Sequence, residues 1–139
     1  MTLYTPDSLS YDLWRQRIAV SDTFRAMLLG SSYTFNTGAH SRRSHVVASE
    51  IAATGGYTAG GVAVTISDSL DTTQHAHILT LSLASIGTGP ITAQYVAYVK
   101  WRGGAATADE LIAVLDLGRT IVSDGAFIVP AQTIKFAKF

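Results

Sequence analysis

The side chains that could do chemistry in this sequence include four histidines, which are His40, His45, His75 and His77. His75 and His77 are two residues apart, so both would lie on one face of a β-strand, as two ligands of one metal ion must. No third ligand follows nearby, and the pair comes directly after a predicted turn. Exposed or interface histidines are therefore the better interpretation, and we expect no bound metal and no cofactor.

Serines and carboxylates are the next candidates for catalysis, but neither forms a recognisable catalytic pattern. No serine lies in the Gly-x-Ser-x-Gly turn that exposes a nucleophile, and the absence of cysteine excludes thiolate chemistry and disulfides. A glycosidase uses two carboxylates that meet in space rather than in sequence, so an enzyme of this class stays an alternative. The carboxylates lie in turn-like contexts, where they usually cap backbone N–H groups; they are Asp68, Asp71, Asp109, Glu110, Asp116 and Asp124. We therefore expect the protein not to be an enzyme.

Two further motifs suggest binding of phosphate or nucleic acid, and both have a simpler interpretation. The glycine-rich segment 55–61 lacks the Lys-Ser/Thr of a phosphate-binding loop and the Gly-x-Gly-x-x-Gly spacing, so tight turns explain its glycines better. Arg42 and Arg43 form an isolated basic pair, which is either solvated or paired with a partner's carboxylate. Because ten Lys and Arg balance ten Asp and Glu, we expect no binding to nucleic acid or to a membrane surface.

Aromatic side chains are concentrated in one apolar segment, where Tyr95, Tyr98 and Trp101 fall on a single predicted strand. Strand periodicity places Tyr95 on the same face as Trp101, and Tyr98 on the other. Core and subunit packing is the ordinary use of such residues. A platform on which a sugar stacks is the alternative interpretation.

The elements that position these residues are predicted to be β-strands, in an antiparallel β-sandwich with a jelly-roll-like arrangement. About seven or eight short strands, with turns between them, are typical of this all-β class. Residues 106–115 could also form a helix, because Thr107 to Glu110 imitates a helix cap, but a strand fits this segment slightly better. The predicted strands are 24–29, 62–67, 78–83, 91–101, 111–117, 121–122, 127–129 and 133–139, of which 111–117 and 121–122 form one or two strands separated by Gly118.

Length and composition indicate one domain with an interaction-prone surface. The chain has 139 residues, of which 47% are hydrophobic and only 14% are charged, against about 25% charged in an average globular protein. Few charges are left to solvate the surface, as is common where much of it meets a partner. We expect neither a signal peptide, since the first 20 residues lack an apolar core, nor a membrane span.

Residues 1–20 differ from the rest and are predicted to be a short helical or extended arm, while residues 21–139 form the β-domain. Leu9, Leu13 and Trp14 could share one face of a short helix. The arm either packs on its own domain or docks on a neighbouring subunit. Trp14 would be its anchor in both cases.

Three segments carry a resemblance to a known family. The first is Ser21 to Asn36, which contains Gly-Ser-Ser-Tyr-Thr; the second is Thr37-Gly38-Ala39-His40; the third is Glu50-Ile51-Ala52-Ala53-Thr54-Gly55-Gly56-Tyr57-Thr58-Ala59-Gly60-Gly61. In this order they resemble a family of small tailed-phage virion proteins, described as capsid decoration (cement), head-fibre or tail-fibre proteins. Later segments up to residue 137 follow the family more weakly, and residues 1–20 lie outside the resemblance.

The resemblance implies a structural component of a virion that is assembled in the cytoplasm of a bacterial host. We favour a capsid decoration protein that binds the outer surface of the major capsid protein, as a homodimer or homotrimer at a symmetry axis. A head- or tail-fibre component that binds a host glycan through Tyr95, Tyr98 or Trp101 is the alternative. The candidate interface residues are Trp14, Tyr33, Arg42, Arg43, Tyr57 and Trp101.

Overall fold

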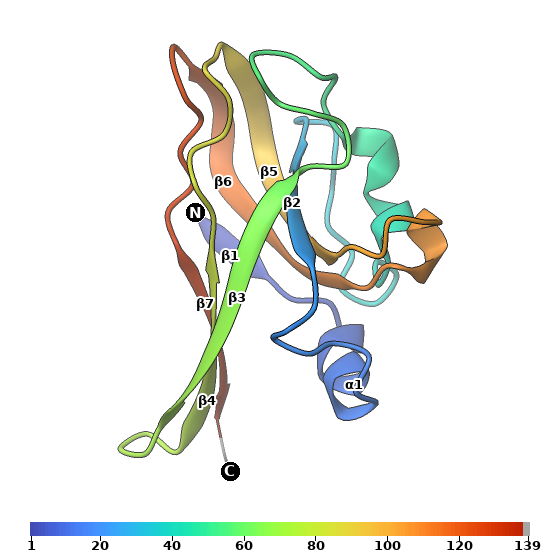
Figure 1. The fold of residues 1–139 in the computed structure, drawn as a ribbon, viewed down its shortest axis with the longest axis vertical. Helices are drawn as coiled ribbons and strands as arrows, with labels where there is room; N and C mark the ends of the chain where they lie inside the picture. Colours follow the sequence, from blue (N-terminus) through green and yellow to red (C-terminus); the bar gives the residue numbers. More distant parts are fainter. Residues whose placement is uncertain (138–139) are drawn as a thin grey trace.

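The computed structural model describes residues 1–137, which form one antiparallel sheet of seven strands in the order β1-β6-β5-β2-β3-β4-β7 (Figure 1). The sheet curls around its own core until it is nearly closed, so the predicted all-β, antiparallel class is confirmed. The strands are β1 (Thr2–Tyr4), β2 (Phe24–Leu29), β3 (Val62–Asp71), β4 (Ala76–Ser82), β5 (Ile91–Lys100), β6 (Leu111–Ser123) and β7 (Gln132–Ala137). The helices are α1 (Ser8–Trp14) and the three short 3-10 helices η1 (Arg43–His45), η2 (Val47–Ser49) and η3 (Ala106–Ala108).

The main core lies on the concave face of the sheet, because alternate residues of each strand point inward. In β2, for example, Phe24, Ala26 and Leu28 belong to this core, while Met27 and Leu29 point to the other side. Tyr98 of β5 is also part of the main core and is fully buried. Burial also raises the pKa of its hydroxyl to about 12. Because its side chain is fully buried, Tyr98 is a packing residue and not part of a surface platform.

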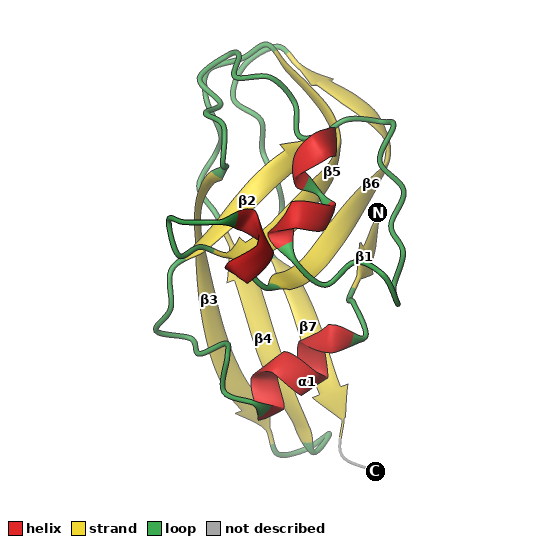
Figure 2. Ribbon diagram, turned by 90° about the vertical axis from the view of Figure 1, so that its right-hand side faces the viewer, coloured by secondary structure: helices red, strands yellow, loops and turns green. Residues whose placement is uncertain are grey.

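A second, smaller core covers the convex face over β2, β5 and the start of β6. Tyr33 and Val46, from the long connection between β2 and β3, pack there on Met27 and Leu29 of β2 and on Val99 of β5. Figure 2 shows the 3-10 helices gathered over this face. Strands buried on both faces read as continuous apolar runs rather than alternating ones, which explains the pattern Tyr-Val-Ala-Tyr-Val in β5.

The first 20 residues are part of the domain, as one of the two sequence-based alternatives requires. β1 adds to the edge of the sheet, with Leu3 opposite Leu115 of β6. α1 then lies against one end of the curled sheet, where Leu9 is buried and Leu13 packs on the main core (Figure 2). The N-terminal segment is therefore fixed to its own domain and not a separate arm.

Several predicted element boundaries need correction. β3 continues to Asp71, beyond the turn expected from residue 68, and β6 runs through Gly118 as one strand. Residues 106–108 are a 3-10 helix and the strand starts at Leu111, so the helical alternative for residues 106–115 is wrong over most of its length. Phe127 makes only a single bridge with Ile86 and does not start a strand.

Candidate interaction site

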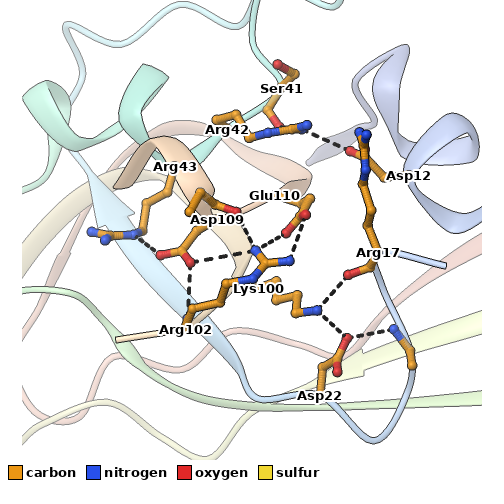
Figure 3. A network of polar contacts seen from close by, with 12 residues as sticks. Asp12, Arg17, Asp22, Ser41, Arg42, Arg43, Lys100, Arg102, Asp109 and Glu110 are labelled. Carbon is orange, nitrogen blue, oxygen red and sulfur yellow. Dashed lines mark hydrogen bonds and ion pairs between the residues drawn. The ribbon is translucent and has the colours of Figure 1, made fainter. Parts of the chain in front are cut away.

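The connection between β2 and β3 is held in place by buried charges, beginning with Asp12 of α1. The carboxylate of Asp12 is fully buried and forms two ion pairs, with Arg17 (3.1 Å between Oδ1 and Nη1) and Arg42 (3.0 Å between Oδ2 and Nη1). Figure 3 shows how the Arg42 side chain reaches from the connection to α1. This carboxylate therefore joins the N-terminal helix to a loop 30 residues further along the chain.

A second set of buried charges joins the same connection to the hairpin between β5 and β6 (Figure 3). Asp109 is fully buried, and its Oδ2 accepts a hydrogen bond from Nε of Arg43 at 2.7 Å, while its Oδ1 accepts one from the backbone N–H of Arg102 at 3.1 Å. Glu110 pairs with the guanidinium of Arg102 through both carboxylate oxygens. Burial raises the pKa of Glu110, but the hydrogen bonds from Arg102 outweigh this and leave the pKa lowered.

Lys100 completes the network at the end of β5. Its ammonium group donates to the backbone oxygen of Arg17 at 2.6 Å and lies 2.9 Å from Oδ2 of Asp22. Burial raises the pKa of Asp22, but hydrogen bonds from the backbone of Ala19 and from Lys100 outweigh this effect and lower it. Ion pairs and hydrogen bonds thus join residues 12–43 to residues 100–110, which are far apart in the sequence.

The Arg42–Arg43 pair was expected to be solvated or to bind a partner's carboxylate, and the structure corrects this interpretation. Both guanidinium groups pair with carboxylates of the chain itself, at Asp12 and Asp109. Arg43 is also buried and donates to the backbone oxygen of Gly104 at 3.0 Å. These side chains position the connection and are not available to bind an anionic partner.

Trp101 lies beneath two guanidinium groups and does not present an open stacking surface. The Cζ atoms of Arg25 and Arg43 lie 4.1 Å and 4.5 Å from its ring centroid. Gly60 packs against the same ring, since a Cβ atom there would lie 2.9 Å from Cη2 of Trp101. With Tyr98 buried in the main core, only Tyr95 of the three strand aromatics remains at the surface as a candidate for sugar binding.

Glu50 and Tyr57, which lie in segment 50–61, attach the connection between β2 and β3 to strand β2. The Tyr57 hydroxyl donates to Oε2 of Glu50 at 2.5 Å and accepts a hydrogen bond from the backbone N–H of Leu28 at 3.0 Å. Oε2 of Glu50 also accepts from the backbone N–H of Gly60 at 2.9 Å. Burial and the hydrogen bond to Glu50 raise the pKa of Tyr57, so its hydroxyl stays protonated and keeps these bonds.

The four histidines lie in two separate places. His40 and His45 stack with ring centroids 5.8 Å apart, and Nδ1 of His40 is 2.9 Å from the hydroxyl of Tyr33. Burial lowers the pKa of His40, and the nearby His45 adds to this effect. His75 and His77 sit at the hairpin between β3 and β4, where His77 lies 3.3 Å from Asp68. Within residues 1–137 no three His, Cys, Asp or Glu side chains are grouped so that they could hold a metal ion.

Trp14, at the end of α1, is 84% exposed although its helix is firmly held. Next to the helix, a hollow of about 180 Å³ opens between residues 13–20 and the β3–β4 hairpin; its apolar lining includes Leu13, Val20 and Leu79. Leu70, near the tip of the hairpin, is 77% exposed. Trp14 on α1 and Leu70 on β3 are therefore large apolar side chains presented to solvent.

The structure thus divides the predicted interface residues into three groups. Tyr33, Tyr57 and Arg43 are buried inside the domain, where they hold the connection between β2 and β3 and contribute little to its surface. Trp14 is on the surface, whereas Arg42 and Trp101 are partly buried and engaged within the chain. The sequence analysis did not identify Asp12 or Glu50 as residues with a role. Asp12 follows the buried Leu9 by three residues in α1, so both lie on the same face of the helix, and this spacing is a signal that could have shown the burial of Asp12.

Comparisons with known proteins give no match, whether to a family model, to a curated protein or to a solved structure. Within residues 1–137, none of the helices is long and apolar enough to cross a membrane. The functional argument therefore depends on the residues themselves.

Proposed function

We propose that this protein is a structural component of a tailed-phage virion, which decorates the capsid by binding the outer surface of the major capsid protein. The observation that carries the proposal is the exposed Trp14 on a fixed helix. The resemblance of segments 21–61 to virion proteins supports the assignment to a virion. The connection that contains these family-like segments has a structural role, through Glu50 and Tyr57.

Trp14 has the properties of an anchor for a protein partner. Tryptophan, tyrosine and arginine dominate the energetics of protein interfaces, because they bury a large area at a low entropic penalty. Tyr11 is exposed on the same helix, and the guanidinium groups of Arg15 and Arg17 lie over its ring at 5.6 Å and 5.4 Å. Since Asp12 fixes the helix through two ion pairs, little ordering entropy remains to be lost when a partner binds.

The distribution of charge favours the same function. Within residues 1–137, five basic side chains are in ion pairs with carboxylates of the same chain; they are Arg17, Arg42, Arg43, Lys100 and Arg102. Pairing within the chain leaves fewer charges that a partner would have to desolvate, and Trp14 and Leu70 add exposed apolar side chains. A capsid offers many equivalent positions for such a contact, and copies joined as a homodimer or homotrimer would bind with a high effective concentration.

The proposal is tested by binding the isolated protein to capsid shells of the encoding phage that were prepared without it. We expect the Trp14→Ala variant to bind at least about 30-fold more weakly, since a hot-spot residue contributes about 2 kcal/mol or more. Ile128→Ala is the matched control: this side chain is 76% exposed on the segment between β6 and β7, and we expect its removal to leave affinity unchanged.

Two results would count against the proposal. If the unmodified protein does not bind the shells but does bind isolated tails, the fibre alternative replaces capsid decoration. If Trp14→Ala binds the shells as well as the unmodified protein, α1 is not the contact surface.

A further inference from the structure

An aromatic hollow opens on the convex side of the sheet, and no residue of α1 lines it. Its volume is about 200 Å³, and it lies between β1, the connection after β2, and the paired strands β5 and β6. Tyr4, Phe35 and Tyr95 supply aromatic rings, while Thr34 and Asp116 supply polar groups. None of these five residues belongs to the ion-pair network or to the surface around Trp14.

The rings that line this aromatic hollow are held in fixed positions. Tyr4 and Phe35 stack with centroids 5.4 Å apart and an interplanar angle of 17°. Tyr95 is supported from behind by the buried Tyr33, whose ring meets it edge-on at 5.2 Å and 73°. Phe35 also meets the ring of His40 edge-on at 6.1 Å. The aromatic surface is therefore preorganised, which lowers the entropic penalty for binding a ligand.

Asp116 gives the aromatic hollow a hydrogen-bond acceptor that the fold uses only in part. Its Oδ1 accepts from the backbone N–H of Gly118 at 2.8 Å, while its Oδ2 has no hydrogen-bond or ion-pair partner within residues 1–137. This distinguishes Asp116 from Asp12 and Asp109, whose carboxylates are occupied by arginines. Burial raises the pKa of the nearby Tyr95, and the closeness of Asp116 and Tyr4 raises it further, so the Tyr95 hydroxyl stays protonated and can donate.

We propose that the aromatic hollow binds a single pyranose ring of a neutral saccharide. The C–H face of a sugar carries a small positive charge and packs on the negative face of an aromatic ring. Its hydroxyl groups would donate to Asp116 and exchange hydrogen bonds with the hydroxyls of Thr34 and Tyr95. The volume is below the roughly 300–1,000 Å³ of pockets for drug-sized ligands, which fits one ring rather than a longer chain.

The charge of Asp116 further restricts the ligand. A carboxylate repels an anionic sugar, so a neutral hexose or N-acetylhexosamine is favoured over a sialic acid. This site differs from the platform predicted in the sequence, since of Tyr95, Tyr98 and Trp101 only Tyr95 takes part. It is also independent of capsid binding, because it uses neither Trp14 nor the hollow beside α1.

The test is a titration of the isolated ¹⁵N-labelled protein with the methyl glycosides of glucose, galactose, mannose and N-acetylglucosamine. We expect at least one of them to shift the amide signals of Thr34, Tyr95 and Gly118 in a saturable way. Asp116→Asn should weaken this binding about tenfold or more, because a hydrogen bond to a charged group is lost, while the amide oxygen can still accept from Gly118. Phe35→Leu should weaken it further by removing an aromatic face.

Asp71→Asn is the matched control, because Asp71 also caps backbone N–H groups in a turn, those of Thr73 and Gln74, far from the aromatic hollow in sequence. We expect this variant to bind as the unmodified protein does. The proposal is overturned if none of the four glycosides shifts these amides, if Asp116→Asn leaves the affinity unchanged, or if methyl sialoside binds better than the neutral glycosides. Should Phe35→Leu fail to fold, Asp116→Asn alone decides the matter.

Discussion

Removal of the charge of Asp109 is the sharpest test of the ion-pair network. In Asp109→Asn the side chain keeps its shape and an oxygen for the N–H of Arg102, but Arg43 loses its only carboxylate partner within residues 1–137. Arg43 is itself 7% exposed, so its guanidinium cannot be rehydrated without moving the connection between β2 and β3. The substitution leaves a buried charge without its counter-ion.

The expected loss of stability follows from that burial. Breaking a buried ion pair on one side destabilises a protein by about 3–5 kcal/mol, and the retained hydrogen bond places Asp109→Asn near the lower value. For a domain of this size, about 3 kcal/mol corresponds to a fall in Tm of roughly 10 °C. Urea unfolding should show a lower midpoint with an unchanged slope. Asp124→Asn, at an exposed site, should change stability by less than about 0.5 kcal/mol.

A double-mutant cycle identifies the cause of the loss. Arg43→Met and the double variant with Asp109→Asn complete the cycle, and we expect a coupling energy of at least about 1.5 kcal/mol between the two sites. The double variant should therefore lose less free energy of unfolding than the two single variants lose together. A loss below about 1 kcal/mol for Asp109→Asn, or a coupling energy near zero, would refute the assignment of this pair as the element that fixes the connection.

Three further predictions concern the same framework. The pKa values of Glu110 and Asp22 in the folded state are lowered from the ordinary values of 4.5 and 3.8. The stability that these carboxylates contribute is therefore complete above the ordinary values and is lost as the pH falls through the folded-state values. When Tm is measured from pH 7 to pH 2, it should decrease once the pH is below about 4.5, and a Tm that does not change with pH would contradict this. Tyr57→Phe removes the partner of the Leu28 N–H and of Glu50, so urea unfolding should show a loss of about 1–3 kcal/mol, and no loss would mean that these bonds contribute nothing. Gly61→Ala should lower the free energy of unfolding by about 1–3 kcal/mol or more in the same assay, because φ of Gly61 is +94° and the new Cβ would lie 2.3 Å from the backbone oxygen of Ala26. An unchanged free energy of unfolding would contradict the close approach of Gly61 to Ala26.

Local patterns predicted the strands well where an apolar run ends at clear turn residues. The strand at residues 24–29 was placed correctly, because Gly30, Ser31 and Ser32 follow it directly. Gly118 left the prediction open between one and two strands in this region; in the structure Asp116 caps its N–H and β6 continues through it as one strand. A glycine in a strand indicates a bend as readily as an end.

The candidate site was harder to predict, because its contacts join residues far apart in the sequence. Arg43 and Asp109 are separated by 66 residues, so no local pattern could show that the arginine is buried and paired. Tyr33 and Tyr57 lie in a Ser- and Gly-rich stretch that resembles a surface loop. The burial of Tyr33 follows from the convex face of β2 and β5 being apolar as well, which the continuous apolar run in β5 already indicated. Tyr57 is instead buried in the main core, where its hydroxyl meets the N–H of Leu28.

The central claim, that the protein decorates a capsid through α1, is tested most directly by a cryo-EM map of the phage particle. Our account predicts density for this fold at regular positions on the outer surface of the capsid, with α1 and Trp14 against the major capsid protein. The hollow formed by Tyr4, Phe35 and Tyr95 should face solvent. Density found only at the tail or its tip, or copies on the capsid with Trp14 exposed to solvent, would contradict it.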